Sequence, residues 1–237
     1  MKPARIVSKP AARKAAKPRP KRLSPAETAR IAEIFARFEA AEDHPKTELH
    51  YNSPYTLVVA VALSAQATDK SVNKATEGLF AVADTPRKML DLGLERLTQM
   101  IRTIGLYRNK AKNVIALSHI LVDQYGGEVP LQRDALQSLP GVGRKTASVV
   151  LNELDIEPAI AVDTHVFRVS HRLKLSNGKT PDAVELELMA KVPQPYLTRA
   201  HHWLILHGRY VCIARKPKCE ICRVADLCPS RVLFMGV

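Results

Sequence analysis

The stretch LPGVGRKTASVV, residues 139–150, decides the fold because it turns one helix sharply into the next. Apolar residues end a short helix before the turn, and an apolar face at helical spacing follows it. Gly141 and Gly143 allow unusual backbone angles and close approach to a ligand, and N–H groups at a helix start favour an anion. The pattern predicts a helix-hairpin-helix over about 132–154, in which Gly141, Gly143 and Arg144 grip a DNA phosphate.

A nucleotide-binding loop is the first alternative, because Lys145-Thr146 resembles the end of one. That motif requires glycine directly before the lysine and a second glycine five residues earlier. Here those two positions hold Arg144 and Leu139, and no parallel-strand pattern precedes them. The sequence therefore disfavours a nucleotide-binding loop.

A lysine and a carboxylate near the hairpin raise the possibility of catalysis. Lys145 stands in the first turn of the second predicted helix, and its amine is a nucleophile when neutral. Most lysines at such positions are solvated or contact phosphate. Asp163, eighteen residues downstream, follows an apolar segment and precedes another predicted helix, where a carboxylate is usually an N-cap. If both face one site, they permit amine chemistry at an electrophilic carbon.

The rest of the chain is also helical in pattern, so the predicted fold class is all-α. Ser24-Pro25-Ala26-Glu27 has the form of a capping box and predicts a helix from about 25 to 42. Leu57 to Ala67 reads as a buried helix. Further apolar stripes end at Gly105 and at Gly126-Gly127. We expect a six-helix domain over 47–157 and a second domain made of 23–46 with 158–237, with a ligand site between them.

Charge points to a polyanionic partner. The chain has 237 residues and a net charge of +13, from 36 basic and 23 acidic residues. Residues 1–22 hold five lysines, four arginines and no acidic residue, and their composition predicts a disordered tail. The tail is interpreted as a DNA-attracting arm, with an inert solubilising tail or an organelle-targeting segment as alternatives. The partner itself is nucleic acid or an anionic membrane surface.

Nothing in the sequence predicts a membrane span. The longest apolar run, Leu57 to Leu63, is far shorter than the ~20 residues that cross a bilayer. We therefore expect a soluble, intracellular protein. A cytoplasmic location of bacterial type and a monomeric state are the default expectations.

All four cysteines lie close together near the C-terminus, with the spacing C-x6-C-x2-C-x5-C: Cys212, Cys219, Cys222 and Cys228. Four thiolates bind zinc or an iron–sulfur cluster, and the residue types alone leave both open. The loop between the first two cysteines carries Arg215, Lys216 and Lys218. A loop anchored by a metal at both ends would present these cations to phosphates in fixed geometry.

The motifs in combination resemble a known family. LPGVGRKTASVVLNELDIEPAIAVDTHVFRV, residues 139–169, is similar to the hairpin and aspartate region of the helix-hairpin-helix DNA glycosylase superfamily. With HHWLILHGRYVCIARKPKCEICRVADLC, residues 201–228, the resemblance extends to the members that carry an iron–sulfur cluster. It spans about 24–228 and implies a [4Fe–4S] cluster on the four cysteines.

The resemblance implies an enzyme of base excision DNA repair. It would be a bifunctional DNA glycosylase and AP lyase that acts on oxidised pyrimidines and abasic sites in double-stranded DNA. Lys145 matches the nucleophile that forms a Schiff base with the sugar, and β-elimination then breaks the strand on the 3′ side. Asp163 matches the aspartate that assists base departure. The alternatives are a glycosylase of mismatch type and a non-catalytic DNA-binding protein.

A base inside a duplex must be flipped out before it can react. By the family match, Gln66 fills the vacated space and Leu106 wedges into the opposite strand. From the residues alone, Gln66 is equally a helix cap and Leu106 a core residue. Ser64, Asp69 and His165 lie in the matched segments and are candidates for lining the pocket.

Overall fold

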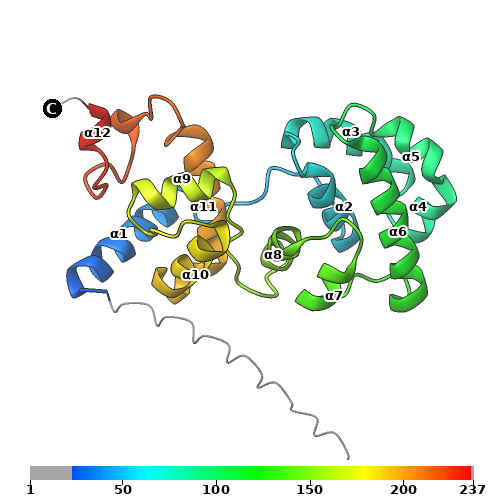
Figure 1. Cartoon of the computed structure of the whole chain (residues 1–237), viewed down its shortest axis with the longest axis horizontal. Helices are drawn as coiled ribbons and strands as arrows, with labels where there is room; N and C mark the ends of the chain where they lie inside the picture. The colour runs from blue at the N-terminus through cyan, green and yellow to red at the C-terminus, as the bar shows by residue number, and fades with distance from the viewer. Residues whose placement is uncertain (1–22, 236–237) are drawn as a thin grey trace, which may run out of the picture.

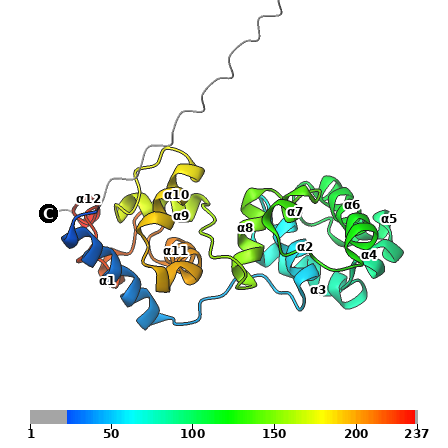
Figure 2. The same ribbon diagram turned by 90° about the horizontal axis from the view of Figure 1, so that it is seen from below.

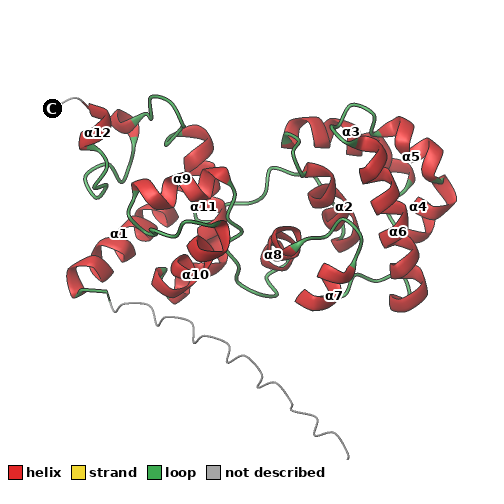
Figure 3. Cartoon of the chain, in the orientation of Figure 1, coloured by secondary structure: helices red, strands yellow, loops and turns green. Residues whose placement is uncertain are grey.

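The computed structural model describes residues 23–235, and it is helical throughout that range. The basic tail, residues 1–22, lies outside the described part, so its predicted disorder stays a prediction. The described residues contain no strand, as Figure 3 shows, which confirms the all-α class. None of their helices is long and apolar enough to span a bilayer.

The elements follow one another as α1 (Pro25–Ala41), α2 (Pro54–Ser64), α3 (Asp69–Val82), α4 (Pro86–Leu92), α5 (Leu94–Met100), α6 (Tyr107–Tyr125), α7 (Arg133–Ser138), α8 (Arg144–Glu153), α9 (Thr164–Arg172), α10 (Pro181–Lys191), the 3-10 helix η1 (Gln194–Tyr196), α11 (Leu197–Tyr210), the 3-10 helix η2 (Cys219–Ile221) and α12 (Val232–Met235). Figures 1 and 2 show two lobes, one formed by α2 to α8 and the other by α1 with α9 to α12. Two chain segments cross between them, 42–53 and 154–163.

The first lobe is built around α2. Its residues from Tyr55 to Leu63 are all buried, because α3, α6 and α8 pack around it. The predicted helix over Leu57–Ala67 therefore exists with shifted bounds: Ser53 caps it earlier and it ends at Ser64. Residues 47–157 contain seven helices and not the six expected, since Gly93, with φ of 78°, ends α4 and starts α5.

The second lobe joins the two ends of the described chain. Ser24 caps α1 by accepting a hydrogen bond from the Glu27 N–H, as the sequence predicted. Arg30 donates to the carbonyls of Leu173 and Leu227, at 2.9 and 3.1 Å. A separate hydrophobic core forms here from residues of α1, α9, α10 and α11, and the N-terminal helix thus completes the cysteine-bearing lobe.

The helices α9 and α11 approach each other closely at Gly208. A Cβ atom at this position would lie 2.9 Å from the His165 Cβ and 3.1 Å from a Val169 methyl group. Contacts this short do not occur between real side chains, so only glycine permits this packing. His165 belongs to the first turn of α9, directly after Asp163.

We predict that Gly208→Ala lowers the free energy of unfolding by about 1–3 kcal/mol, because the added methyl group pushes α11 away from α9. Urea unfolding measures the change. Gly78→Ala is the matched control, since Gly78 is also helical and its added Cβ would meet only the Met100 Cε at 3.8 Å. The control should gain about 0.5–1 kcal/mol from helix propensity. Equal effects of both substitutions would contradict the close-packing argument.

Candidate active site and cysteine cluster

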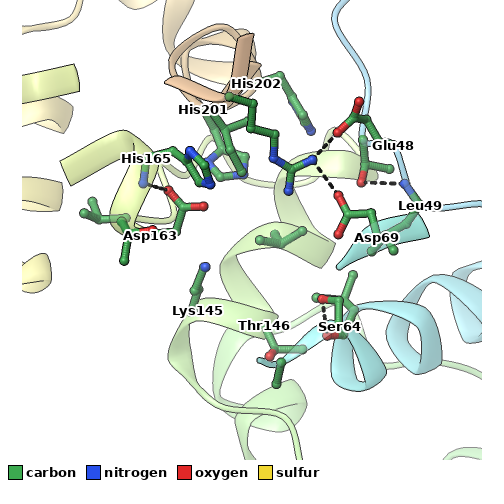
Figure 4. A pocket seen from close by; sticks show the side chains of 18 of the residues that line it. Glu48, Leu49, Ser64, Asp69, Lys145, Thr146, Asp163, His165, His201 and His202 are labelled. Carbon is green, nitrogen blue, oxygen red and sulfur yellow. Dashed lines mark hydrogen bonds and ion pairs between the residues drawn. The ribbon is translucent and has the colours of Figure 1, made fainter. Parts of the chain in front are cut away.

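A pocket of about 720 Å³ lies between the two lobes. Its walls come from the end of α2 and the start of α3, from the first turn of α8, from the start of α9, and from α11. It brings together six residues that the sequence singled out: Ser64, Gln66, Asp69, Lys145, Asp163 and His165. Figure 4 shows the Lys145 amine and the Asp163 carboxylate facing each other inside it.

The hairpin directs Lys145 into this pocket. Gly141 turns the chain with φ of 81°, and Gly143 is the N-cap of α8. Gly143 offers no side chain to cap the helix, so the first N–H groups of α8 remain available to an anion. Arg144 pairs with Glu185 of α10 at 3.2 Å, whereas Lys145 is exposed and points into the pocket.

Asp163 has two roles at once. It is the N-cap of α9, and its Oδ1 accepts hydrogen bonds from the His165 and Val166 N–H groups, both at 2.8 Å. The structural interpretation of this residue as a cap is therefore correct. Because both bonds end on Oδ1, the carboxylate is held rigidly with Oδ2 left for a group in the pocket. The cap thus fixes the orientation of the carboxylate opposite Lys145.

An ionic bridge connects the lobes at the pocket wall. Arg209 of α11 donates to Asp69 of α3 at 2.6 Å and also to Glu48, which lies in the first connecting segment. Burial opposes the charge on Arg209, but its hydrogen bonds to the two carboxylates outweigh burial and raise its pKa. Asp69, a candidate pocket residue, thus contributes mainly to this bridge. The sequence analysis missed Arg209 and Glu48.

Two histidines of α11 form another wall of the pocket. His201 is 4% exposed, and burial lowers its pKa well below the usual range, so it is neutral at physiological pH. The His202 Nε2 lies 3.0 Å from the carboxylate of Glu153, the last residue of α8. This contact ties the helix that carries Lys145 to the second lobe. Neither His201 nor His202 was predicted from the sequence to have this role.

The segments predicted to enter the duplex lie side by side. Gln66 and Leu106 both have left-handed backbone conformations, with φ of 54° and 59°, which non-glycine residues rarely adopt. Both residues line a groove of about 180 Å³ that also includes Gly141. Leu106 is 60% exposed, so the core interpretation is wrong for it, and Gln66 is exposed as well. An exposed leucine beside a polar tip suits insertion between bases.

Two other predicted residues are held by local bonds. The Ser64 hydroxyl donates to the Val61 carbonyl at 2.9 Å, at the end of α2. The His165 Nδ1 lies 3.2 Å from Arg168 in the next turn of α9. Both side chains line the pocket (Figure 4).

The four cysteines surround one small cavity in the second lobe, and all four thiols are free. Within residues 23–235, no three His, Cys, Asp or Glu side chains gather tightly enough for a single metal ion; the thiols stand around a cavity instead. Four thiolates around one point suit a cluster in which each thiolate binds a different iron. Burial raises the pKa of the Cys222 thiol to about 11, so binding of the cluster must displace protons.

The loop after Cys212 is fixed by α9. Arg172 donates to the Ile213 and Ala214 carbonyls at 2.7 and 2.9 Å, and Arg168 donates to the Cys212 carbonyl at 3.0 Å. The three predicted phosphate-binding cations of this loop are all exposed: Arg215, Lys216 and Lys218. Their backbone is therefore positioned by protein contacts as well as by the cysteines.

Comparison with family models gives two matches. Residues 59–194 match the HhH-GPD superfamily of base excision DNA repair proteins. Residues 212–228, which include all four cysteines, match the iron-sulfur binding domain of endonuclease III. The second match favours an iron–sulfur cluster over zinc.

Individual relatives agree. The chain is 56% identical to endonuclease III of Haemophilus influenzae over 83% of this chain and 93% of that protein. It is 54% identical to endonuclease III of Escherichia coli K12, over 84% and 95% of the two chains. A solved non-covalent endonuclease III–DNA complex has a TM-score of 0.82 at 43% identity, covering 89% of this chain and 99% of that one. A trapped endonuclease III–DNA covalent intermediate has a TM-score of 0.79 at 44% identity, over 86% and 96%.

We predict that the purified protein is yellow-brown and contains about four irons and four sulfides per chain, because four thiolates suit a [4Fe–4S] cluster. Metal analysis and the visible absorption spectrum measure this. Cys222→Ser should lose most of the iron, whereas Ile221→Ser, at an exposed neighbouring position, should keep it. A colourless protein isolated with zinc would contradict the assignment.

Proposed function

This chain belongs to the endonuclease III family of helix-hairpin-helix base excision repair proteins, and on that premise we propose which of its residues carry out the reaction. It is a DNA glycosylase and AP lyase, and it carries an iron–sulfur cluster. A non-catalytic DNA-binding protein is thereby excluded. We assign Lys145 as the nucleophile and Asp163 as the residue that assists base departure.

The observation that carries this assignment is the meeting of Lys145 and Asp163 in the pocket between the lobes. The neutral Lys145 amine attacks the sugar C1′, and the bond from C1′ to the base breaks as the base leaves with the electron pair. Asp163 accepts a proton from the lysine or stabilises the positive charge that develops on the sugar. The ring then opens to give a Schiff base, and loss of a C2′ proton expels the 3′ phosphate.

Binding of the duplex uses the exposed elements on both lobes. Gly141, Gly143 and Arg144 contact phosphates at the hairpin, while Gln66 and Leu106 enter the helix. The cations of the cysteine loop, Arg215, Lys216 and Lys218, contact phosphates from the second lobe. Support comes from their exposure, and from the groove that Gln66, Leu106 and Gly141 share.

The substrates we propose are oxidised pyrimidines, as the resemblance implies, together with abasic sites. The hydrogen-bonding groups around the pocket suit a base with added oxygen atoms. We also propose that the enzyme acts as a monomer in the compartment that holds the chromosome. Within the described residues, one chain supplies both lobes and every wall of the pocket.

We predict that borohydride traps the wild-type protein on abasic-site DNA and that Lys145→Gln abolishes this trapping, because an amide cannot form a Schiff base. The trapped complex is measured on a denaturing gel, and DNA binding by gel shift should change little. Lys46→Gln is the matched control, since Lys46 also lines the pocket and loses the same charge. Trapping that persists in Lys145→Gln would assign the nucleophile elsewhere.

A panel of duplexes, each with one lesion, tests the substrate class. We expect the highest kcat/KM for ring-saturated pyrimidines such as thymine glycol, and little release of intact thymine from a T·G mismatch. Base release is measured by gel after alkaline cleavage. Preferred release of mismatched thymine would replace this substrate class with the mismatch type.

A further inference from the structure

The two residues proposed to enter the duplex come from neighbouring loops. Leu106 is the N-cap of α6, and Gln66 follows the end of α2. A Cβ atom added to Gly105 would lie 3.8 Å from the Gln66 carbonyl oxygen, so the two loops lie side by side. Each tip has a strained backbone, which persists only when surrounding contacts hold it.

Lys110 supplies such a contact from beneath. Its side chain is nearly buried, at 7% exposure, and its Nζ donates to the Leu63 carbonyl at 2.9 Å. Leu63 lies in the last turn of α2, where carbonyls lack helical partners; the Ala67 N–H bonds to Ser64 instead. The ammonium group therefore caps the negative end of α2.

A buried lysine without a carboxylate is costly. Burial lowers the pKa of Lys110, and within residues 23–235 it forms no ion pair. An apolar residue at this place would fill the same space at lower cost, since the buried stripe of α6 continues through Val114 and Leu117. The bond to α2 is what lysine adds.

The second turn of α6 lies against the hairpin, which is the third element proposed to contact DNA. A Cβ atom on Gly141 would lie 3.0 Å from the Asn113 Cβ and 3.1 Å from its Nδ2. The first two turns of α6 therefore carry Leu106, hold the end of α2 before Gln66, and abut the hairpin at Gly141. All of these elements line the same groove.

We propose that Lys110 is a positioning residue for base flipping, which holds the Gln66 and Leu106 loops in register so that they enter the duplex together. This rests on the proposed roles of Gln66 and Leu106. Lys110 lines the groove that Gln66 and Leu106 share and not the pocket between the lobes. It acts through the carbonyl of Leu63, and its loss uncouples the two tips without removing Lys145 or Asp163.

The test compares one abasic site in two settings, fully paired duplex and an unpaired bulge where the sugar is already outside the stack. Lys110→Met should lower single-turnover strand cleavage in the paired duplex by about tenfold or more and leave bulge cleavage within about twofold. A 2-aminopurine placed opposite an uncleavable abasic analogue reports unstacking by a rise in fluorescence when the wild-type protein binds. Binding of Lys110→Met should not produce this rise. Lys112→Met is the control, because Lys112 is exposed on the same helix and loses the same charge.

Lys110→Arg, which keeps a donor, should recover part of the duplex rate. An equal loss in duplex and bulge, or no loss in either, would overturn the proposal. Thermal melting shows whether Lys110→Met folds. If it does not, Lys110→Arg is compared with the wild type instead. A lower cleavage rate in the paired duplex alone then supports the positioning role, and any other pattern overturns it. Borohydride trapping of the wild-type protein and of Lys145→Gln on the bulged substrate tests the role of Lys145 separately. A failure of the catalytic assignment can therefore be distinguished from a failure of the positioning role.

Discussion

The start of α9 at Asp163 is the constraint on which the site depends. Two hydrogen bonds from the first turn hold Oδ1 of Asp163, so the carboxylate cannot rotate freely. A helix N-terminus favours an acidic side chain at this position. If the helix began one residue later, the side chain would lose both bonds. The local rule that starts a helix thus also orients a reactive group, and the structural and catalytic interpretations of Asp163 do not compete.

The same helix connects the pocket to the cysteine cluster. Arg168 and Arg172 follow Asp163 by roughly one and two turns and bind carbonyls of the loop after Cys212. Arg168 also donates to the Gly208 carbonyl at 2.8 Å, where α11 crosses closely because no side chain intervenes. The cysteine loop, although it does not line the pocket, therefore helps to set the position of α9.

Sequence predicted those features that depend on neighbours along the chain. Four such features were predicted: the hairpin, the α1 cap, the Asp163 cap and the cysteine spacing. The iron–sulfur cluster and the family were predicted from these local motifs. The bridge from Arg209 to Glu48 and Asp69 was missed, because its partners are separated by 161 and 140 residues. Lys110 did leave a signal, since it lies on the helical face of Val114 and Leu117. A lysine on the apolar face of a helix indicates that its ammonium group has a buried polar partner.

The strained tips show why side chains that are proposed to enter the duplex need support from the protein core. A left-handed conformation at Gln66 or Leu106 costs free energy that glycine would avoid, yet glycine has no side chain to insert. The chain must therefore hold a side chain in a backbone conformation that it does not prefer. One such contact joins α6 to α2, from Lys110 to the Leu63 carbonyl, at the groove that the two tips share. Because these contacts exist before DNA binds, the ordering cost is met during folding, and more of the binding free energy remains to unstack the base.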